Sequence, residues 1–332
     1  MSNVEFSVVI PVRNGANYIR AALESVLSQS YPYFRILVLE NGSTDETLEI
    51  IRGLASDRIT IVPAIVSLSI EQNWGRIIEQ PLSEYFTFMG HDDMLHPDFL
   101  AEMATLIAVE PGAALYQVQL EEIDAAGNPV RHPPQIAYRE TADQYLSAVL
   151  EGREEVVGTG YVMRSDDYRQ VGGIPAFPGL LYADVVLWYR LTNLSYKVCS
   201  PKTLASFRIH PQSMHLKANF LHYYRATLQY YDFLRTSTGL KDSPTATYNE
   251  IDKRLQNSYR SAVVQAILSP VEGRTRLQMT KQEVAKDGLF TLHDRAARMY
   301  EAIPPLPSWL RDIILLPVVW RRMLRRMLAN RK

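Results

Sequence analysis

The first 120 residues of this 332-residue chain predict an α/β fold with a doubly wound, mostly parallel sheet. Short apolar, β-branched runs alternate with segments whose apolar residues recur at helical spacing. This alternation is typical of a parallel sheet covered by helices on both faces. Polar residues also follow three of the predicted strands directly, at the positions where such sheets bind their ligands.

The predicted strands in this part of the chain lie at residues 6–12, 34–39, 59–62, 85–89 and 114–120. Helical spacing covers residues 17–28, and Ser43 to Glu46 has the spacing of a capping box for a second helix. Further helices are expected at 141–157 and 183–194, and extended segments at 158–164 and 197–210. From Phe220 onward the pattern is helical, with an aromatic stripe typical of helix packing. We therefore expect one domain at 1–218 and a helical domain at 219–332.

The composition is that of a folded protein of a reducing compartment. Apolar residues make up 47% and charged residues 21%, which argues against disorder. The single cysteine, Cys199, excludes an intrachain disulfide. The first residues lack the basic region of a signal peptide, and no window is apolar for the roughly 18 residues that a membrane span needs. These features predict a cytoplasmic protein.

Charge is divided unevenly along the chain. Residues 1–218 carry 16 Lys or Arg and 26 Asp or Glu, whereas residues 219–332 carry 19 and 10. Either the basic part meets a polyanion or an anionic surface, or the two parts attract each other. The tail at 309–332 joins apolar residues to arginines, among them Arg321, Arg322, Arg325 and Arg326, so it suits a peripheral helix at the cytoplasmic face of a membrane or a helix packed on a second copy. Nucleic acid is not an expected partner, because no recognised module accompanies the charge.

The most informative segment is Gly90-His91-Asp92-Asp93, which follows an apolar strand. Carboxylates at the end of a buried strand are costly to desolvate unless a cation or a ligand hydroxyl meets them. Acidic oxygens suit Mg²⁺ or Mn²⁺, and these ions usually bind together with a substrate's phosphates. The segment therefore predicts a metal–diphosphate site. The alternative is a pair of acids at the N-terminus of the helix that follows Pro97.

Six segments, taken in order, carry a family resemblance: Ser7–Gly15, Leu39–Asp45, Gly90–Asp93, Gly172–Gly173, Ala183–Trp188 and Phe207–Ser213. Together they resemble the GT-A domain of family 2 glycosyltransferases over about residues 5–215. The resemblance implies a nucleotide-sugar donor, above all a UDP-sugar, and a divalent ion, Mn²⁺ or Mg²⁺. It also implies inversion at the anomeric carbon and an acceptor hydroxyl on a glycan or a lipid-linked saccharide.

On the donor side, the resemblance implies that Pro11, Arg13 and Glu40 border the nucleoside. Glu40 stands where the family usually has Asp, and its longer side chain still accepts a hydrogen bond from a base N–H. Arg76 lies on a helix where relatives contact the donor, so it is either near the phosphates or a surface arginine. Arg13 is either a donor contact or a solvated charge at a strand end.

On the metal side, Asp92 matches the family's metal-binding Asp, while Gly90 replaces the first Asp of that motif. Asp93 is expected to orient the site or touch the acceptor. His210 matches a position that reaches the diphosphate or the metal in some relatives; the alternative is a histidine satisfied within a turn. Asp184 matches the catalytic base, although the Glu that usually precedes it is Ala183 here; its alternative role is a helix cap.

The expected chemistry is a single displacement. Breaking the sugar–diphosphate bond leaves negative charge on the phosphate, which a divalent ion stabilises. The transition state resembles an oxocarbenium ion, and a carboxylate must accept the proton of the acceptor hydroxyl. One rival is a non-catalytic nucleotide- or sugar-binding protein of the same fold, suggested by Gly90, Ala183 and Val186. Another is a nucleotidyltransferase, but Val12–Gly15 is too short for the Gly-rich phosphate loop that it needs.

Overall fold

The computed structural model describes residues 4–210 and 220–237. The chain divides into two compact units, of which the first comprises residues 1–218 and 228–244 and contains every strand of the sheet. The second comprises residues 219–227 and 245–332, and most of it lies outside the described residues. The expected domain boundary at residue 218 and the basic tail at 309–332 therefore stay predictions.

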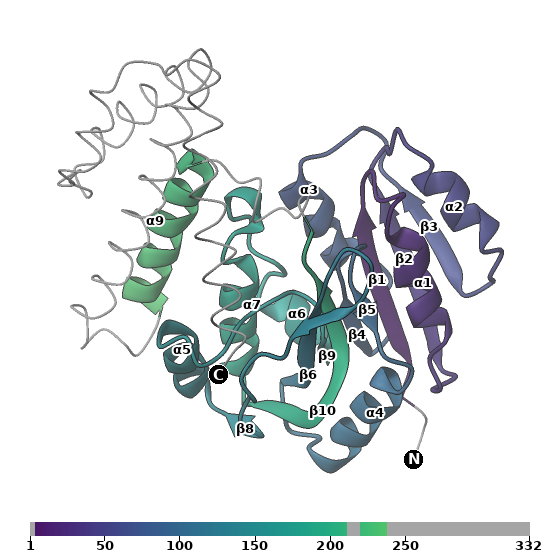
Figure 1. Cartoon of the computed structure of the whole chain (residues 1–332). Helices are drawn as coiled ribbons and strands as arrows, with labels where there is room; N and C mark the ends of the chain where they lie inside the picture. The colour runs from purple at the N-terminus through teal and green to yellow at the C-terminus, as the bar shows by residue number, and fades with distance from the viewer. Residues whose placement is uncertain (1–3, 211–219, 238–332) are drawn as a thin grey trace, which may run out of the picture. The chain divides into compact units, whose positions relative to one another are not determined.

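A ten-stranded sheet forms the centre of the first unit, in the order β3-β2-β1-β4-β9-β6-β10-β5, with β7 paired to β6 and β8 to β10 (Figure 1). Parallel pairing joins β3 (Ile59–Pro63), β2 (Phe34–Glu40), β1 (Phe6–Val12) and β4 (Tyr85–Phe88). The predicted parallel sheet is therefore correct for this half, and each of its four strands lies within a residue of its predicted bounds.

The other half of the sheet is mixed. The strand β9 (Tyr161–Arg164) lies between β4 and β6 (Leu115–Ile123) and is antiparallel to both, while β10 (Lys197–Arg208) is parallel to β6. Three short strands complete this half with antiparallel pairs: β5 (Met94–Leu95), β7 (Pro129–Arg131) and β8 (Arg139–Glu140). The insertion of β9 brings the end of β10 to the same edge of the sheet as the ends of β1, β2 and β4.

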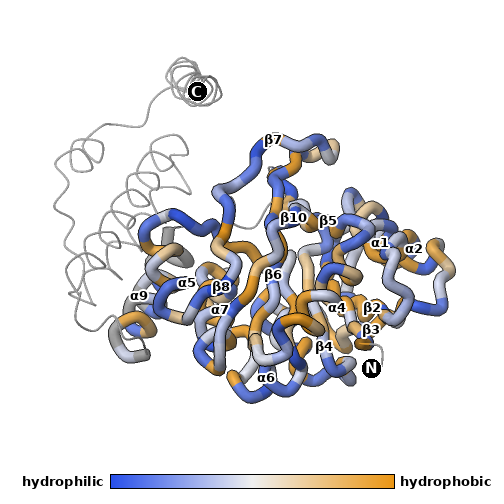
Figure 2. Tube along the Cα trace, turned by 90° about the horizontal axis from the view of Figure 1, so that it is seen from below, coloured by the Kyte–Doolittle hydropathy of each residue, from blue (hydrophilic) through white to orange (hydrophobic). Residues whose placement is uncertain are grey.

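Both faces of the sheet are buried, as the continuous apolar runs of β1 and β2 predict. On one face, alternate residues of β1 pack in a core with α1 (Ile19–Leu27) and α4 (Phe99–Val109), and α2 (Thr47–Gly53) lies beside α1. Figure 2 shows hydrophobic residues in the strands around β4 and β6, in contrast to the hydrophilic stretch around α6 (Ser165–Gln170).

The other face carries an aromatic core. Trp188 of α7 (Ala183–Thr192) is fully buried and stacks on Phe88 at 5.4 Å and on Tyr161 at 4.2 Å between ring centroids. Such pairs contribute about 0.5–1.5 kcal/mol each beyond the area that they bury. Trp188 is therefore a core residue, and its packing fixes the start of α7, where Asp184 lies.

The remaining helices are α3 (Ile70–Gly75), η1 (Arg76–Glu79), α5 (Ala142–Leu150), η2 (Pro178–Leu180) and α9 (Phe220–Ser237). The helix expected at 141–157 ends at Leu150, and its start is fixed by a capping box between Thr141 and Gln144. In α9, the ring of Tyr230 stacks on that of Tyr182 at 4.7 Å between centroids. The side chains of the aromatic stripe itself, Phe220, Tyr223, Tyr224 and Tyr231, lie outside the described residues, so its packing role stays a prediction. Within the described ranges, no helix has the length and apolar character to cross a bilayer.

The capping box predicted at Ser43 to Glu46 is wrong. The helix α2 begins after Glu46, which makes no side-chain cap; Asp45 Oδ1 instead accepts the N–H of Thr47 at 3.1 Å. The backbone N–H groups of residues 14 to 16 donate to Ser43 Oγ at 3.0 Å, Thr47 Oγ1 at 2.8 Å and Asp45 Oδ2 at 3.1 Å. These bonds tie the turn after β1 to the segment after β2.

Candidate functional site

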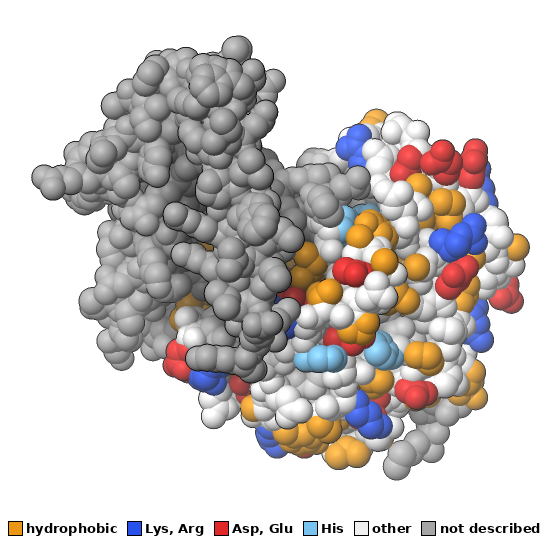
Figure 3. Space-filling view, in the orientation of Figure 1, with side chains coloured by type: hydrophobic (Ala, Val, Ile, Leu, Met, Phe, Trp, Pro, Cys, Tyr) orange, Lys and Arg blue, Asp and Glu red, His pale blue; other side chains and the backbone are white. Residues whose placement is uncertain are grey.

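A cleft of about 530 Å³ lies at the carboxyl ends of β1, β2 and β4. Histidine and acidic side chains lie close together on the face shown in Figure 3. This is the position at which ligands bind in sheets of this kind. The cleft is lined by residues from five segments of the chain: Pro11 to Gly15, Asn17, Tyr18, Asn41, Leu68 to Ile70, Asn73, Trp74, His91, Asp92 and His210.

The structure brings Asp92 and His210 together, although they are 118 positions apart. The Oδ2 atom of Asp92 lies 2.8 Å from Nε2 of His210, and the side chains are 21% and 5% exposed. Each side chain follows a strand end, Asp92 after β4 and His210 after β10. A carboxylate and an imidazole thus converge on one point of the cleft, and their role as metal ligands stays a prediction.

Asp93 is not among the residues that line the cleft and is 3% exposed. One carboxylate oxygen accepts the hydroxyl of Thr159, and the other accepts the backbone N–H of Arg208 at 3.0 Å. Thr159 also accepts the N–H of Gly90 at 3.2 Å. Burial and the neighbouring Asp92 charge raise the pKa of Asp93. This arrangement fits the expectation that Asp93 orients the site.

Glu40 is buried at the end of β2, and its carboxylate holds the following turn. Its two oxygens accept the N–H groups of Gly42 at 3.1 Å and Ser43 at 2.6 Å. The adjacent Asn41 lines the cleft, and its amide exchanges two hydrogen bonds with the backbone of Leu68. A hydrogen bond between Glu40 and a nucleoside base stays a prediction. Such a bond must share a carboxylate whose two oxygens already accept backbone N–H groups.

The other predicted donor residues divide into two groups. Pro11 and Arg13 line the cleft, and Arg13 is exposed. Arg76 is not among the lining residues; its guanidinium donates to the carbonyls of Val62 at 2.9 Å and Pro63 at 3.0 Å and to Asn73 Oδ1 at 3.0 Å. It therefore joins the end of β3 to α3, and a phosphate contact by Arg76 stays a prediction without structural support.

Asp184 lies in the first turn of α7, directly after Tyr182 and Ala183. Burial raises the pKa of its carboxyl to about 6, although the N–H of Val185, which donates at 2.8 Å, opposes that effect. A carboxyl with such a pKa is largely ionised at neutral pH and remains a competent proton acceptor. Asp184 is not among the residues that line the cleft around Asp92.

Several lining residues were not among the predicted site residues: Tyr18, Asn41, Asn73, Trp74 and His91. Asn41 and His91 belong to segments that already carried predicted residues, so proximity in sequence was an available signal. Tyr18 reaches the site because it precedes α1 and its ring lies 4.6 Å from that of His210. No local pattern distinguishes such a tyrosine from a core residue.

The Asp92–His210 pair fits a divalent ion that binds together with a nucleotide. Among the described residues, no three His, Cys, Asp or Glu side chains form a metal-binding group. Mg²⁺ and Mn²⁺ are commonly held by one or two protein ligands, with waters and substrate phosphates completing the shell. Two converging ligands at the open edge of a sheet match that requirement, whereas a closed protein cage does not.

A side chain at residue 90 would crowd the carboxylates of the two aspartates that follow it. A Cβ atom at residue 90 would lie 2.6 Å from Asp92 Oδ1 and 2.9 Å from Asp93 Oδ2. We therefore expect Gly90→Asp, which restores the family pattern, to weaken Mn²⁺ binding, because the new side chain displaces Asp92 from His210. Titration with Mn²⁺ measures this effect.

A matched control for this variant is Gly53→Ala, since nothing lies within 4 Å of a Cβ atom at that position. This control should bind Mn²⁺ as the wild type does. Tighter Mn²⁺ binding by Gly90→Asp would show that the loop opens to accept a third carboxylate, contrary to this expectation.

Comparison with known proteins supports the fold and the family. The family model described as glycosyl transferase family 2 matches residues 7–165. An uncharacterized glycosyltransferase of Rickettsia typhi is 26% identical over 225 residues, which cover 66% of this chain and 69% of that protein. Another, from Rickettsia prowazekii, is 32% identical over 101 residues, 30% of this chain and 31% of that protein.

Two solved structures share the fold at 15% sequence identity. One is S. aureus TarS in complex with UDP-GlcNAc, with a TM-score of 0.58 over 76% of this chain and 72% of that chain. The other is a mannosyltransferase from Pyrobaculum calidifontis in complex with GDP-Man and Mn²⁺, with a TM-score of 0.57 over 96% and 87%. Both bind a nucleotide sugar in these structures, and the predicted GT-A fold is confirmed. The region at residues 7–165, just under half of the chain, is thus similar to glycosyl transferase family 2.

Proposed function

We propose that this glycosyltransferase moves a sugar from a nucleotide-sugar donor, a UDP-sugar in the first instance, to a hydroxyl of a glycan or a lipid-linked saccharide. The observation that carries the proposal is the convergence of Asp92 and His210 in a cleft at the strand ends. The nucleotide-sugar complexes of the two structural neighbours support the donor class.

In the proposed reaction, the nucleoside lies between the end of β1 and α3, where Pro11, Arg13 and Asn73 line the cleft. Asp92 and His210 hold the divalent ion, Mn²⁺ or Mg²⁺. When bound, the ion supplies Lewis-acid stabilisation of the charge on the departing diphosphate. Thr159 and Arg208 keep Asp93, and with it the loop that carries Asp92, in place.

Asp184 is the proposed base. Its carboxylate accepts the proton of the acceptor hydroxyl as that oxygen bonds to the anomeric carbon and the sugar–phosphate bond breaks. The electron pair of the broken bond leaves with the nucleoside diphosphate. Because one displacement occurs on the face opposite the leaving group, the configuration inverts, and no covalent enzyme intermediate is required.

A thermal-shift screen with nucleotide sugars and nucleoside diphosphates, with and without Mn²⁺, tests the proposal. We expect one nucleotide to stabilise the protein, and to do so more strongly with Mn²⁺, because binding to the folded state alone raises its stability. The selected donor should then release nucleoside diphosphate when a hydroxyl acceptor is supplied. Absence of stabilisation by every nucleotide would contradict the donor assignment.

A second candidate function is nucleotide-sugar binding without transfer. It is favoured by Gly90, Ala183 and Val186, which stand where the family has acidic residues. Tight binding of a nucleotide with Mn²⁺, without release of the sugar to any acceptor or to water, would favour this function. A nucleotidyltransferase is disfavoured, because the N–H groups of residues 14 to 16 donate to side chains and do not form a phosphate cradle.

A further inference from the structure

Arg208 is a buried cation at the end of β10, next to the loop that carries Asp92. Its Nε donates to the carbonyl oxygen of Asp92 at 2.7 Å. One terminal nitrogen donates to the carbonyls of Asp124 at 3.0 Å and Ala125 at 3.2 Å, in the turn that follows β6. The side chain therefore joins the acidic loop to the β6–β7 turn.

Two more contacts join the same segments. The backbone N–H of Arg208 donates to Asp93 Oδ1 at 3.0 Å, and His210 contacts the carboxylate of Asp92. Residues 208 and 210 lie two positions apart in an extended segment, so their side chains project from the same face of the segment. Asp92 is thus contacted at its carbonyl oxygen by one of them and at its carboxylate by the other.

Tyr18 adds a contact from the start of α1. The guanidinium carbon of Arg208 lies 5.0 Å from the centroid of the Tyr18 ring, which is within the range of a cation–π interaction. The same ring lies 4.6 Å from that of His210. Arg208, Tyr18 and His210 therefore form one packed group around Asp92.

Arginine suits this position for a physical reason. A buried cation is costly unless its donors are paired, and here a fixed fork of N–H groups reaches carbonyls on two separate segments. A lysine ammonium is a single point of charge and does not reach both segments in this way.

We propose that Arg208 is a positioning residue for the cation site. By holding the main chain at Asp92, it keeps the Asp92 carboxylate and His210 directed at one point of the cleft, and so it sets the affinity for the divalent ion. This inference rests on the proposed function. Residues that orient metal ligands from behind typically change metal affinity 10–100-fold when replaced.

The test uses Arg208→Lys in the full chain. Mn²⁺ is titrated calorimetrically in the presence of UDP or GDP, whichever stabilises the wild type. We expect Mn²⁺ to bind about 10–100-fold more weakly to this variant. We also expect hydrogen–deuterium exchange to increase at residues 90–96, because the carbonyl of Asp92 loses its guanidinium donor. Arg208→Gln, which keeps N–H donors without the charge, serves if the lysine variant does not fold.

Arg164→Lys is the matched control. Arg164 also donates to two backbone carbonyls, those of Pro111 and Ala113, and lies over the ring of Tyr85, but it does not line the cleft. It should lose thermal stability to a similar degree and keep the Mn²⁺ affinity and the exchange of residues 90–96. Equal Mn²⁺ affinities for the two variants, or unchanged exchange in Arg208→Lys, would overturn the inference.

Failure of the proposed function gives a different result. If the wild type binds neither nucleotide, or binds one with no dependence on Mn²⁺, the proposed cation site is wrong and the affinity part of the inference falls with it. Hydrogen exchange at residues 90–96 then decides by itself whether Arg208 positions Asp92.

Discussion

Asp184→Asn is expected to lower kcat by about 10²–10⁴-fold while nucleotide binding stays unchanged. The amide is nearly the same size as the carboxylate, so α7 should keep its packing, but an amide does not accept the proton of the acceptor hydroxyl. Steady-state rates with the selected donor and acceptor measure the loss, and calorimetric titration of the nucleotide measures the binding.

The pH profile gives an independent test of Asp184. Burial raises the pKa of its carboxyl to about 6, so the fraction of active base falls as the pH drops below that value. The wild-type rate should decrease about tenfold per pH unit at low pH. The residual rate of Asp184→Asn should not show this decrease. Asp143→Asn, which removes a charge from the first turn of α5, should behave as the wild type does. Full turnover by Asp184→Asn would exclude Asp184 as the base.

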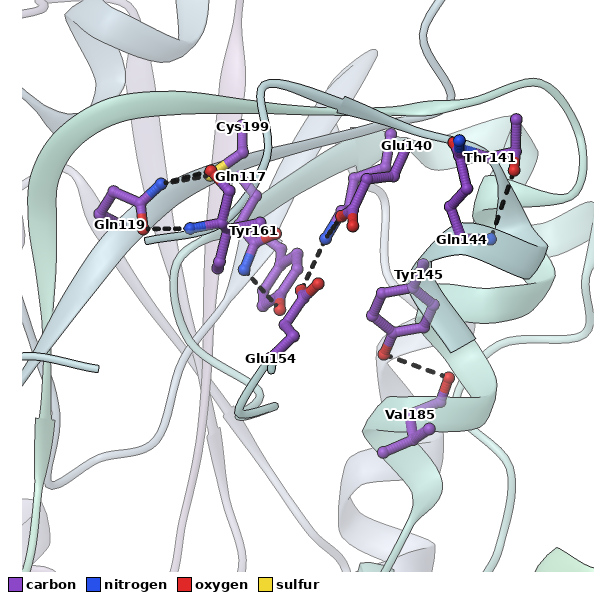
Figure 4. Close-up of polar contacts among 12 residues, drawn as sticks. Gln117, Gln119, Glu140, Thr141, Gln144, Tyr145, Glu154, Tyr161, Val185 and Cys199 are labelled. Atoms are coloured by element: carbon purple, nitrogen blue, oxygen red, sulfur yellow. Dashed lines mark hydrogen bonds and ion pairs between the residues drawn. The ribbon is translucent and has the colours of Figure 1, made fainter. Parts of the chain in front are cut away.

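Lys197→Met is expected to lower the free energy of unfolding by about 3–5 kcal/mol at pH 8. Lys197 is fully buried, and its Nζ lies 2.6 Å from Glu154 Oε1 and 2.8 Å from Glu140 Oε2. Figure 4 labels these two glutamates. Without the ammonium, two carboxylates remain buried with no cation. Denaturant unfolding of the variant and the wild type gives the difference, and Glu140→Gln with Glu154→Gln in the same chain should recover part of it.

The decrease in the free energy of unfolding caused by Lys197→Met should depend on pH in a defined direction. Burial, opposed by Lys197, raises the pKa of Glu154 even in the wild type, and removal of Lys197 raises it further. A carboxyl whose pKa is raised in the folded state costs more stability as the pH rises through that pKa, so the variant should be closer to the wild type at pH 5 than at pH 8. Burial keeps the neighbouring Tyr145, Tyr161 and Cys199 neutral by raising their pKa values.

Lys202→Met is the control for this prediction. Lys202 also lies 2.6 Å from a carboxylate, that of Glu102, but its side chain is 61% exposed, and exposed ion pairs contribute little. Its melting temperature should be close to that of the wild type. Equal destabilisation of Lys197→Met at pH 5 and pH 8 would contradict the role assigned to the buried cluster.

The fold was predictable from the sequence wherever a local pattern decides the structure. The hydrophobic pattern and the residue composition of the sequence predicted the positions of β1 to β4, because these strands are buried on both faces and have continuous apolar runs. The order of the second half of the sheet was not predictable, since β9 is antiparallel between β4 and β6 through contacts remote in sequence. The buried ion pair between Lys197 and Glu154 was not predictable for the same reason. Each of these charged residues, taken alone, resembles a surface residue.

The candidate site was predictable where residues follow strand ends. Pro11, Arg13, Asp92 and His210 line one cleft, because parallel strands bring their carboxyl ends to the same edge. The position of Arg76 was not predictable, since its contacts with backbone carbonyls depend on how η1 meets the end of β3. The buried cluster around Asp93, Thr159 and Arg208 likewise depends on three segments that only the folded chain brings together.

The most direct test of the central claim is anomalous diffraction at the manganese absorption edge from crystals grown with Mn²⁺ and the stabilising nucleoside diphosphate. We expect a manganese peak in direct contact with the Asp92 carboxylate and His210, with the diphosphate oxygens on its other side. A manganese peak remote from both residues, or a diphosphate bound elsewhere on the protein, would contradict the proposed site.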